Sequence, residues 1–139
     1  MNRRTVTVAA LLFVLAALAG ASSGRAAQTP VPSHTLHVGI TEWAVAPSQG
    51  MVFAGQVRLT VENDGRLRHE LDIVRTLDWG ERLEVRNGRA VGQDAVPPVV
   101  VAPGQARSVR VDLEPGFYVL LDNIRGHYAS GAAVSIFVA

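Results

Sequence analysis

Short segments with a period of two in hydrophobicity constrain the fold of this chain more than any other feature. Residues 57–62 read Val-Arg-Leu-Thr-Val-Glu, and residues 109–113 read Val-Arg-Val-Asp-Leu. Such alternation is typical of strands with one face on a core and one face in water. Glycine, proline or an Asn-Asp-Gly sequence follows each segment, as at residues 63–65 and 115–116. The pattern therefore predicts an all-β sandwich.

Three further segments fit the same pattern, and one region does not. Strands are expected in the sequences HELDIV (69–74), FYVLLD (117–122) and AAVSIFVA (132–139). Residues 77–98 have no steady period, and we expect them to leave the sandwich with a hairpin at Asn87-Gly88, a strong two-residue turn signal. No segment beyond the N-terminal region has the pattern of an amphipathic helix.

The N-terminal region is typical of an export signal. Arg3 and Arg4 precede an apolar stretch over residues 5–20, and small residues follow it. We expect residues 1–26 to be a cleaved signal peptide, residues 27–36 a short lead-in and residues 37–139 one domain. A periplasmic or secreted protein with no membrane association after cleavage is the predicted product, and an uncleaved anchor is the weaker alternative.

Composition excludes several classes of function. The chain has 13 basic residues, all arginine, and 12 acidic ones. Cleavage would remove three arginines and leave ten against twelve acids, so nucleic acid is not an expected partner. The absence of cysteine excludes thiolate chemistry. No nucleophile motif is present, and we do not expect an enzyme.

The segment Asp122-Asn-Ile-Arg-Gly-His127-Tyr-Ala-Ser-Gly-Ala132 carries the most specific resemblance. It is similar to the metal loop of cupredoxins, the small blue-copper proteins, which is typically written C-N-x-P-G-H-Y-x-x-G-M. His69, in the sequence NDGRLRHE, resembles the upstream histidine ligand of that family. The resemblance extends over residues 37–139 and implies a cupredoxin fold, which is a Greek-key β-sandwich. By position it implies His69, Asp122 and His127 as metal ligands, while Ala132 replaces the axial methionine.

The replaced ligands change the chemistry that the resemblance implies. A carboxylate is a hard donor, whereas thiolate and thioether are soft donors that select Cu(I). Two imidazoles and a carboxylate favour Cu(II), and they also suit Zn(II). The predicted function is therefore copper binding, copper delivery or electron transfer with a periplasmic redox or copper-handling protein. A type 2 copper enzyme would use similar ligands, but no substrate site is visible in the sequence.

A metal-free interaction module is the alternative function. In that case Asp122 would cap its loop by accepting backbone N–H groups, and His127 would pack against Tyr128. Arg125, where the family has proline, could pair with Asp122 and leave no free ligand.

Other residues that could join a site are weaker candidates. His34 and His37 are three apart and should point to opposite faces of an extended chain. Met51 is expected in the core rather than at the site, and Trp43 in the core or at an edge rather than against a ligand.

Overall fold

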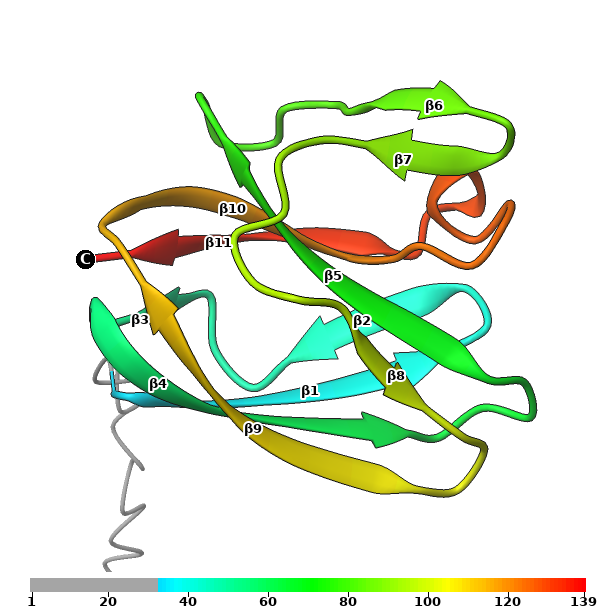
Figure 1. Ribbon diagram of the computed structural model, residues 1–139, viewed down its shortest axis with the longest axis horizontal. Coiled ribbons are helices and arrows are strands. Elements are labelled where there is room, and N and C mark those ends of the chain that lie inside the picture. Colours follow the sequence, from blue (N-terminus) through cyan, green and yellow to red (C-terminus); the bar gives the residue numbers. More distant parts are fainter. Residues whose placement is uncertain (1–32) are drawn as a thin grey trace, which may run out of the picture.

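Two packed β-sheets and a separate hairpin make up the part of the chain that the structure describes, residues 33–139 of a computed structural model (Figure 1). The predicted signal peptide and most of the lead-in lie outside these residues. The strands are β1 (Thr35–Thr41), β2 (Ala44–Pro47), β3 (Met51–Val52), β4 (Gly55–Asn63), β5 (His69–Thr76), β6 (Glu84–Arg86), β7 (Arg89–Val91), β8 (Val99–Val101), β9 (Ala106–Leu113), β10 (Gly116–Asp122) and β11 (Ala133–Val138).

The sheets combine antiparallel and parallel pairs. The first sheet has the order β2-β1-β4-β9, and the second has the order β3-β11-β10-β5-β8. β1 runs parallel to β4, and β3 runs parallel to β11, while the other pairs are antiparallel. The chain therefore crosses between sheets instead of meandering, and the predicted all-β Greek-key sandwich is confirmed.

The alternating segments supply the core between the sheets. Val57, Leu59 and Val61 of β4 are completely buried, and the residues between them face outward. Leu120 and Ile136 meet them from the second sheet, and both are completely buried. Burial of apolar area at about 25 cal/mol per Å² makes this continuous layer the main source of stability.

Residues 77–98 leave the sandwich and cover part of the outer face of the second sheet. Ala90 packs there against Val74, Val119 and Leu121 in a second apolar cluster. The hairpin β6–β7 turns at Asn87 (φ 53°) and Gly88 (φ 78°), two left-handed residues as a type I′ turn requires. The predicted hairpin is confirmed.

Helical structure is minimal in residues 33–139. One 3₁₀ turn, η1 (Tyr128–Ser130), lies just before β11. No helix in this part of the chain is long and apolar enough to cross a membrane.

Candidate metal centre

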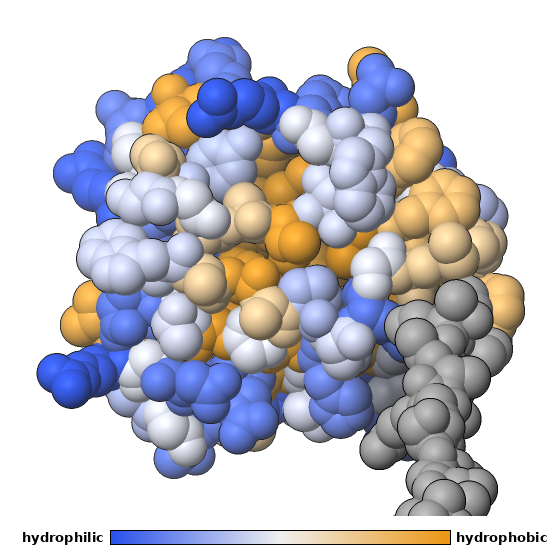
Figure 2. Space-filling view, turned by 180° about the vertical axis from the view of Figure 1, so that it is seen from behind, coloured by the Kyte–Doolittle hydropathy of each residue, from blue (hydrophilic) through white to orange (hydrophobic). Residues whose placement is uncertain are grey.

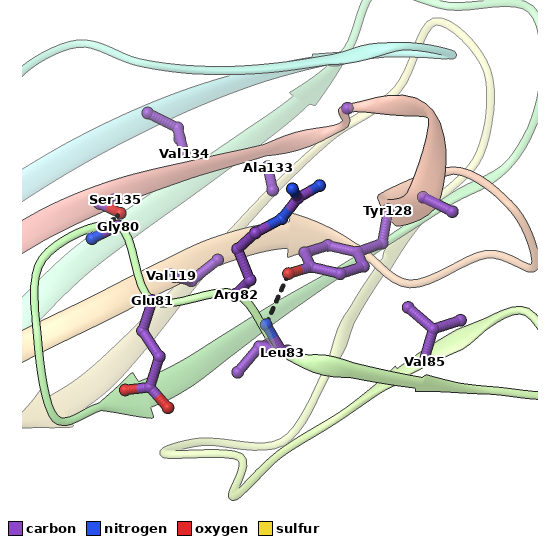
Figure 3. A pocket seen from close by; sticks show the side chains of 12 residues that line it. Gly80, Glu81, Arg82, Leu83, Val85, Val119, Tyr128, Ala133, Val134 and Ser135 are labelled. Carbon is purple, nitrogen blue, oxygen red and sulfur yellow. Dashed lines mark hydrogen bonds between the residues drawn. The ribbon is translucent and has the colours of Figure 1, made fainter.

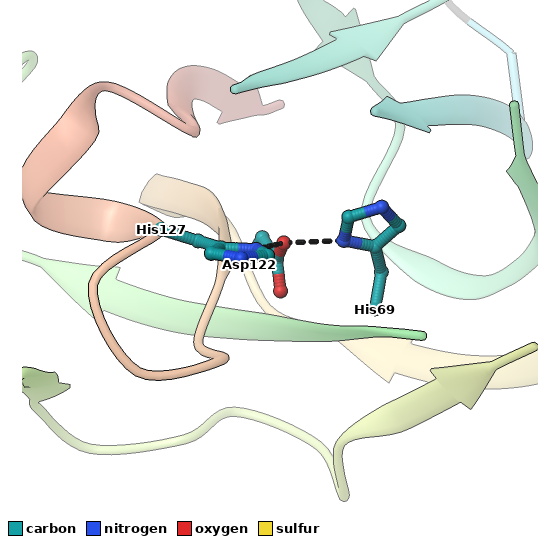
Figure 4. A group of neighbouring side chains, drawn as sticks. All are labelled: His69, Asp122 and His127. Atoms are coloured by element: carbon teal, nitrogen blue, oxygen red, sulfur yellow. Dashed lines mark hydrogen bonds and ion pairs between the residues drawn. The ribbon is translucent and has the colours of Figure 1, made fainter. Parts of the chain in front are cut away.

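Three side chains from distant parts of the sequence meet at one end of the sandwich. His69 begins β5, Asp122 ends β10, and His127 lies in the loop between β10 and β11. β5 and β10 are antiparallel neighbours with Asp122 opposite Leu71, so the pairing brings the start of one strand beside the end of the other. The structure thus brings together the three residues predicted as ligands (Figure 4).

The two imidazoles converge on one carboxylate oxygen. Asp122 Oδ2 lies 2.6 Å from His69 Nδ1 and 2.5 Å from His127 Nδ1. Asp122 Oδ1 accepts hydrogen bonds from the backbone N–H groups of Glu70 and Ile124, each at 3.2 Å. His69 and Asp122 are fully buried, and His127 is 6% exposed. Oδ1 therefore holds the loop, while Oδ2 and the two Nδ1 atoms form the possible donor set.

The backbone of the loop closes on itself around this group. Asp122 N donates to Ala132 O at 3.0 Å, and Ala132 N donates to His127 O at 3.1 Å. Gly126 and Gly131 have φ values of 88° and 104°, which glycine adopts without strain. Ala132 is fully buried, so the position that carries the axial thioether in cupredoxins here holds a methyl group in the core.

The β6–β7 hairpin supports the other side of the loop. Asn123 Oδ1 accepts from Ala90 N at 2.8 Å, and Asn123 Nδ2 donates to Asp72 Oδ2 at 2.6 Å. Arg125 Nε donates to Asn87 O at 2.9 Å. The proposed alternative in which Arg125 pairs with Asp122 was therefore wrong, because the turn carbonyl of the hairpin takes this guanidinium away from the carboxylate.

Burial perturbs a second carboxyl beside the loop. Asp72 is 3% exposed, and its desolvation raises its pKa to about 6, although the hydrogen bond from Asn123 opposes the shift. The nearby charges of Asp94 and Glu70 raise the pKa further. Asp72 Oδ1 has no hydrogen-bond partner among the described residues.

The donor types fit a divalent transition metal, but the present spacing is that of hydrogen bonds. The three donor atoms lie within 4.8 Å of one another. Metal–ligand bonds of about 2.0–2.1 Å at tetrahedral or trigonal angles would separate the donors by roughly 3.3–3.6 Å. The Nδ1–Oδ2 distances of 2.5 and 2.6 Å would therefore have to lengthen by roughly 0.7–1.1 Å. Side-chain rotation on this scale is compatible with a loop whose backbone is fixed.

Trp43 lies against the more accessible histidine. Its ring centroid is 5.5 Å from that of His127, and its side chain is 62% exposed. Trp43 lies in the turn that leads to the edge strand β2, so its predicted place at an edge is confirmed, but the expectation that it would not lie against a candidate ligand was wrong. Periodicity places Trp43 at the end of a strand, but only the β1–β2 turn brings the indole over the loop.

The remaining candidates lie elsewhere. His34 and His37 line separate surface hollows, so they do not converge, as their spacing predicts. Met51 is 41% exposed in β3 and pairs with Phe137 near the far end of β11, so its predicted place in the core was wrong. A two-residue edge strand leaves that side chain on the outer face of the sheet.

A surface pocket on the second sheet is separate from the three donors. It has a volume of about 410 Å³ and lies between residues 80–85 and the outer face of β10 and β11. Arg82 extends into it beside the Tyr128 ring, whose hydroxyl accepts a hydrogen bond from Leu83 N at 2.8 Å (Figure 3). Seen from behind, the molecule has apolar side chains near the middle of the face and along its right side, and hydrophilic ones over most of the remaining rim (Figure 2). None of the donors lines this cavity.

Comparison with known proteins gives similarity of structure only. No family model matches the sequence, and no curated protein matches it. Auracyanin from the photosynthetic bacterium Roseiflexus castenholzii is similar with a TM-score of 0.57 and 20% identity, over 78% of this chain and 99% of auracyanin. Auracyanin B is similar with a TM-score of 0.54 and 21% identity, over 80% of this chain and 92% of auracyanin B.

Rusticyanin from Thiobacillus ferrooxidans gives a TM-score of 0.53 at 19% identity, over 76% of this chain and 78% of rusticyanin. Auracyanin and rusticyanin are cupredoxins. At identities near 20% the likeness concerns the fold and not the site. The chain therefore has a cupredoxin-like fold, and its loop over residues 122–132 has no cysteine.

Proposed function

We propose that this protein is an exported copper-binding protein whose ligands are His69 Nδ1, His127 Nδ1 and a carboxylate oxygen of Asp122. Its role would be copper binding, copper delivery or electron transfer to a periplasmic partner, without enzymatic activity. The observation that supports it is the convergence of both Nδ1 atoms on Asp122 Oδ2 inside a buried loop. Rusticyanin, one of the structurally similar proteins, is a copper protein.

The donor set decides which ion is expected. Imidazole nitrogen and carboxylate oxygen suit Cu(II), which also has the highest affinity of the divalent first-row metals for such ligands. Zn(II) accepts the same donors and is the expected competitor. Without a thiolate, the Cu(II) form would lack the intense colour of a blue-copper protein and would have a lower reduction potential. Export rests on the N-terminal sequence, and the N-terminus of the protein recovered from the periplasm tests it.

Titration of the chelator-stripped protein with Cu(II) tests the site. We expect one equivalent to bind, with nitrogen hyperfine structure in the electron paramagnetic resonance spectrum. His127→Ala should weaken binding by more than the roughly 100-fold that loss of an outer hydrogen-bond partner can cause. His37→Ala is the matched control, because His37 is exposed on the first sheet. Equal binding by wild-type protein and His127→Ala would exclude this site.

A metal-free interaction module is the second candidate. Hydrogen bonds already satisfy the Asp122 carboxylate, and Trp43, which lies against His127, is 62% exposed. In that case the protein would bind no stoichiometric Cu(II), and His127→Ala would keep its capture of a partner protein. The same titration therefore separates the two functions.

A further inference from the structure

One ring nitrogen of the candidate site lacks a partner. His69 is fully buried, and its Nδ1 faces Asp122. Its other ring nitrogen, Nε2, has no hydrogen-bond partner among the described residues. Buried polar atoms are nearly always satisfied, and metal-binding histidines usually donate from the nitrogen that does not bind the metal. An acceptor near Nε2 would therefore fix the orientation of the His69 ring.

Gly65 leaves open the space beside this nitrogen. A Cβ atom at residue 65 would lie 2.7 Å from His69 Nε2 and 2.8 Å from Glu42 Oε1. Real Cβ atoms do not approach other heavy atoms so closely, so any other residue would force one of the two side chains to move. Gly65 is not among the glycines with positive φ. Glycine is therefore required at position 65 for steric reasons. The imidazole nitrogen of His69 and the carboxylate of Glu42 both lie too close to leave room for a Cβ atom.

The carboxylate of Glu42 is held in this place by the backbone. Glu42 lies in the turn between β1 and β2, and its Oε1 accepts from Arg66 N at 2.5 Å and Leu67 N at 3.1 Å. Glu42 Oε1 is therefore a fixed acceptor near Nε2 of the His69 ring, whereas Asp122 faces Nδ1.

Metal binding would create a donor that needs such an acceptor. A neutral imidazole that binds an ion through Nδ1 carries its proton on Nε2. We propose that Glu42 is a positioning residue of the candidate metal centre: its carboxylate accepts the Nε2–H of His69 across the space that Gly65 leaves open. This inference rests on the proposed metal site. The β1–β2 turn would then hold both histidines, with Glu42 at His69 and Trp43 at His127.

Nuclear magnetic resonance of the Zn(II)-loaded, ¹⁵N-labelled protein tests the hydrogen bond directly. In the wild-type protein we expect His69 to be the Nε2–H tautomer, with a ring N–H that exchanges slowly with water. In Glu42→Ala this signal should be lost by exchange, and the Zn(II) affinity should fall about 10- to 100-fold. Glu42→Gln keeps an acceptor oxygen for the Arg66 and Leu67 amides. This variant should recover part of the ring N–H signal and part of the Zn(II) affinity.

Two glycines provide a matched pair for the steric step. Gly65→Ala should weaken Zn(II) binding and shift the His69 ring signals. Gly50→Ala should change neither, because nothing lies within 4 Å of a Cβ at that position. A folded Glu42→Ala protein with unchanged His69 signals and unchanged affinity would overturn this role of Glu42 but leave the metal site intact. Failure of the wild-type protein to bind Zn(II) or Cu(II) would overturn both.

Discussion

Asp72 shows how one buried carboxyl can act against stability in this fold. Its Oδ2 accepts from Asn123, but its Oδ1 is buried without a partner in residues 33–139. Burial raises its pKa from the usual 3.8 to about 6. The folded protein therefore binds a proton that the unfolded chain has already released between about pH 4 and pH 6. The resulting loss of stability is absent below about pH 4, grows as the pH rises through this window and is complete above pH 6.

Asp72→Asn should accordingly stabilise the protein in a pH-dependent way. At pH 7.5 we expect its free energy of unfolding to exceed that of the wild type by on the order of 2–3 kcal/mol, because the amide carries no charge to desolvate. The difference should shrink as the pH falls from 6 to 4. Urea denaturation at a series of pH values measures it, with the exposed Asp112→Asn as control. A difference that does not vary with pH would contradict this assignment.

The hairpin β6–β7 is held by contacts with the loop over residues 122–132 rather than by a shared sheet. It forms a two-stranded sheet of its own, and Gly88 O accepts from Gly126 N at 2.7 Å. Asn123 adds three hydrogen bonds, two to the backbone of Ala90 and one to Asp72. One asparagine next to Asp122 therefore joins the hairpin to the candidate metal loop.

Asn123→Ala should loosen this connection. It leaves the buried N–H and C=O groups of Ala90 without partners, and we expect the free energy of unfolding to fall by about 2–4 kcal/mol. Hydrogen exchange at the Ala90 amide should accelerate more than exchange in β4, since the hairpin opens locally. Arg86→Ala, on the exposed side of the same hairpin, should have little effect. Equal acceleration throughout the sandwich would show that the hairpin has no separate opening.

The sequence predicts these elements unequally, for physical reasons. Alternation reveals β4 and β9 because each has one face in the core and one in water. Alternation cannot reveal β3, because two residues are too few to show a period. This strand forms only through its pairing with β11. The Asn87-Gly88 turn is local chemistry and is readable. The order of strands in the sheets cannot be read from the sequence, because it depends on which strands pack against one another in the folded chain.

The candidate site is likewise predictable from the sequence only in part. The resemblance of residues 122–132 places Asp122 and His127 on one loop, but their approach to His69 depends on the pairing of β5 with β10. Glu42 carries no signal in the sequence, because its contact with residues 66 and 67 arises only when β1 lies beside β4. Local sequence thus indicates the donors, and tertiary structure determines what surrounds them.

At the scale of the whole molecule, one continuous core joins the two sheets. Leu59 lies in the middle of it and is fully buried, whereas Leu77 is 87% exposed on the excursion. Leu59→Ala should lower the free energy of unfolding by about 2–5 kcal/mol, because it leaves a cavity that close-packed neighbours cannot fill. Leu77→Ala should change it by less than about 0.5 kcal/mol. Chemical denaturation of both variants measures the difference, and similar losses would contradict a single core.

The position of Trp43 gives this molecule an optical property of its own. Its indole is mostly exposed and its centroid is 5.5 Å from that of His127, while Trp79 belongs to the excursion after β5. Paramagnetic Cu(II) quenches the fluorescence of a nearby indole, and diamagnetic Zn(II) does not do so by that route. If the proposed site binds either ion, the emission of Trp43 would therefore distinguish Cu(II) from Zn(II) without any label.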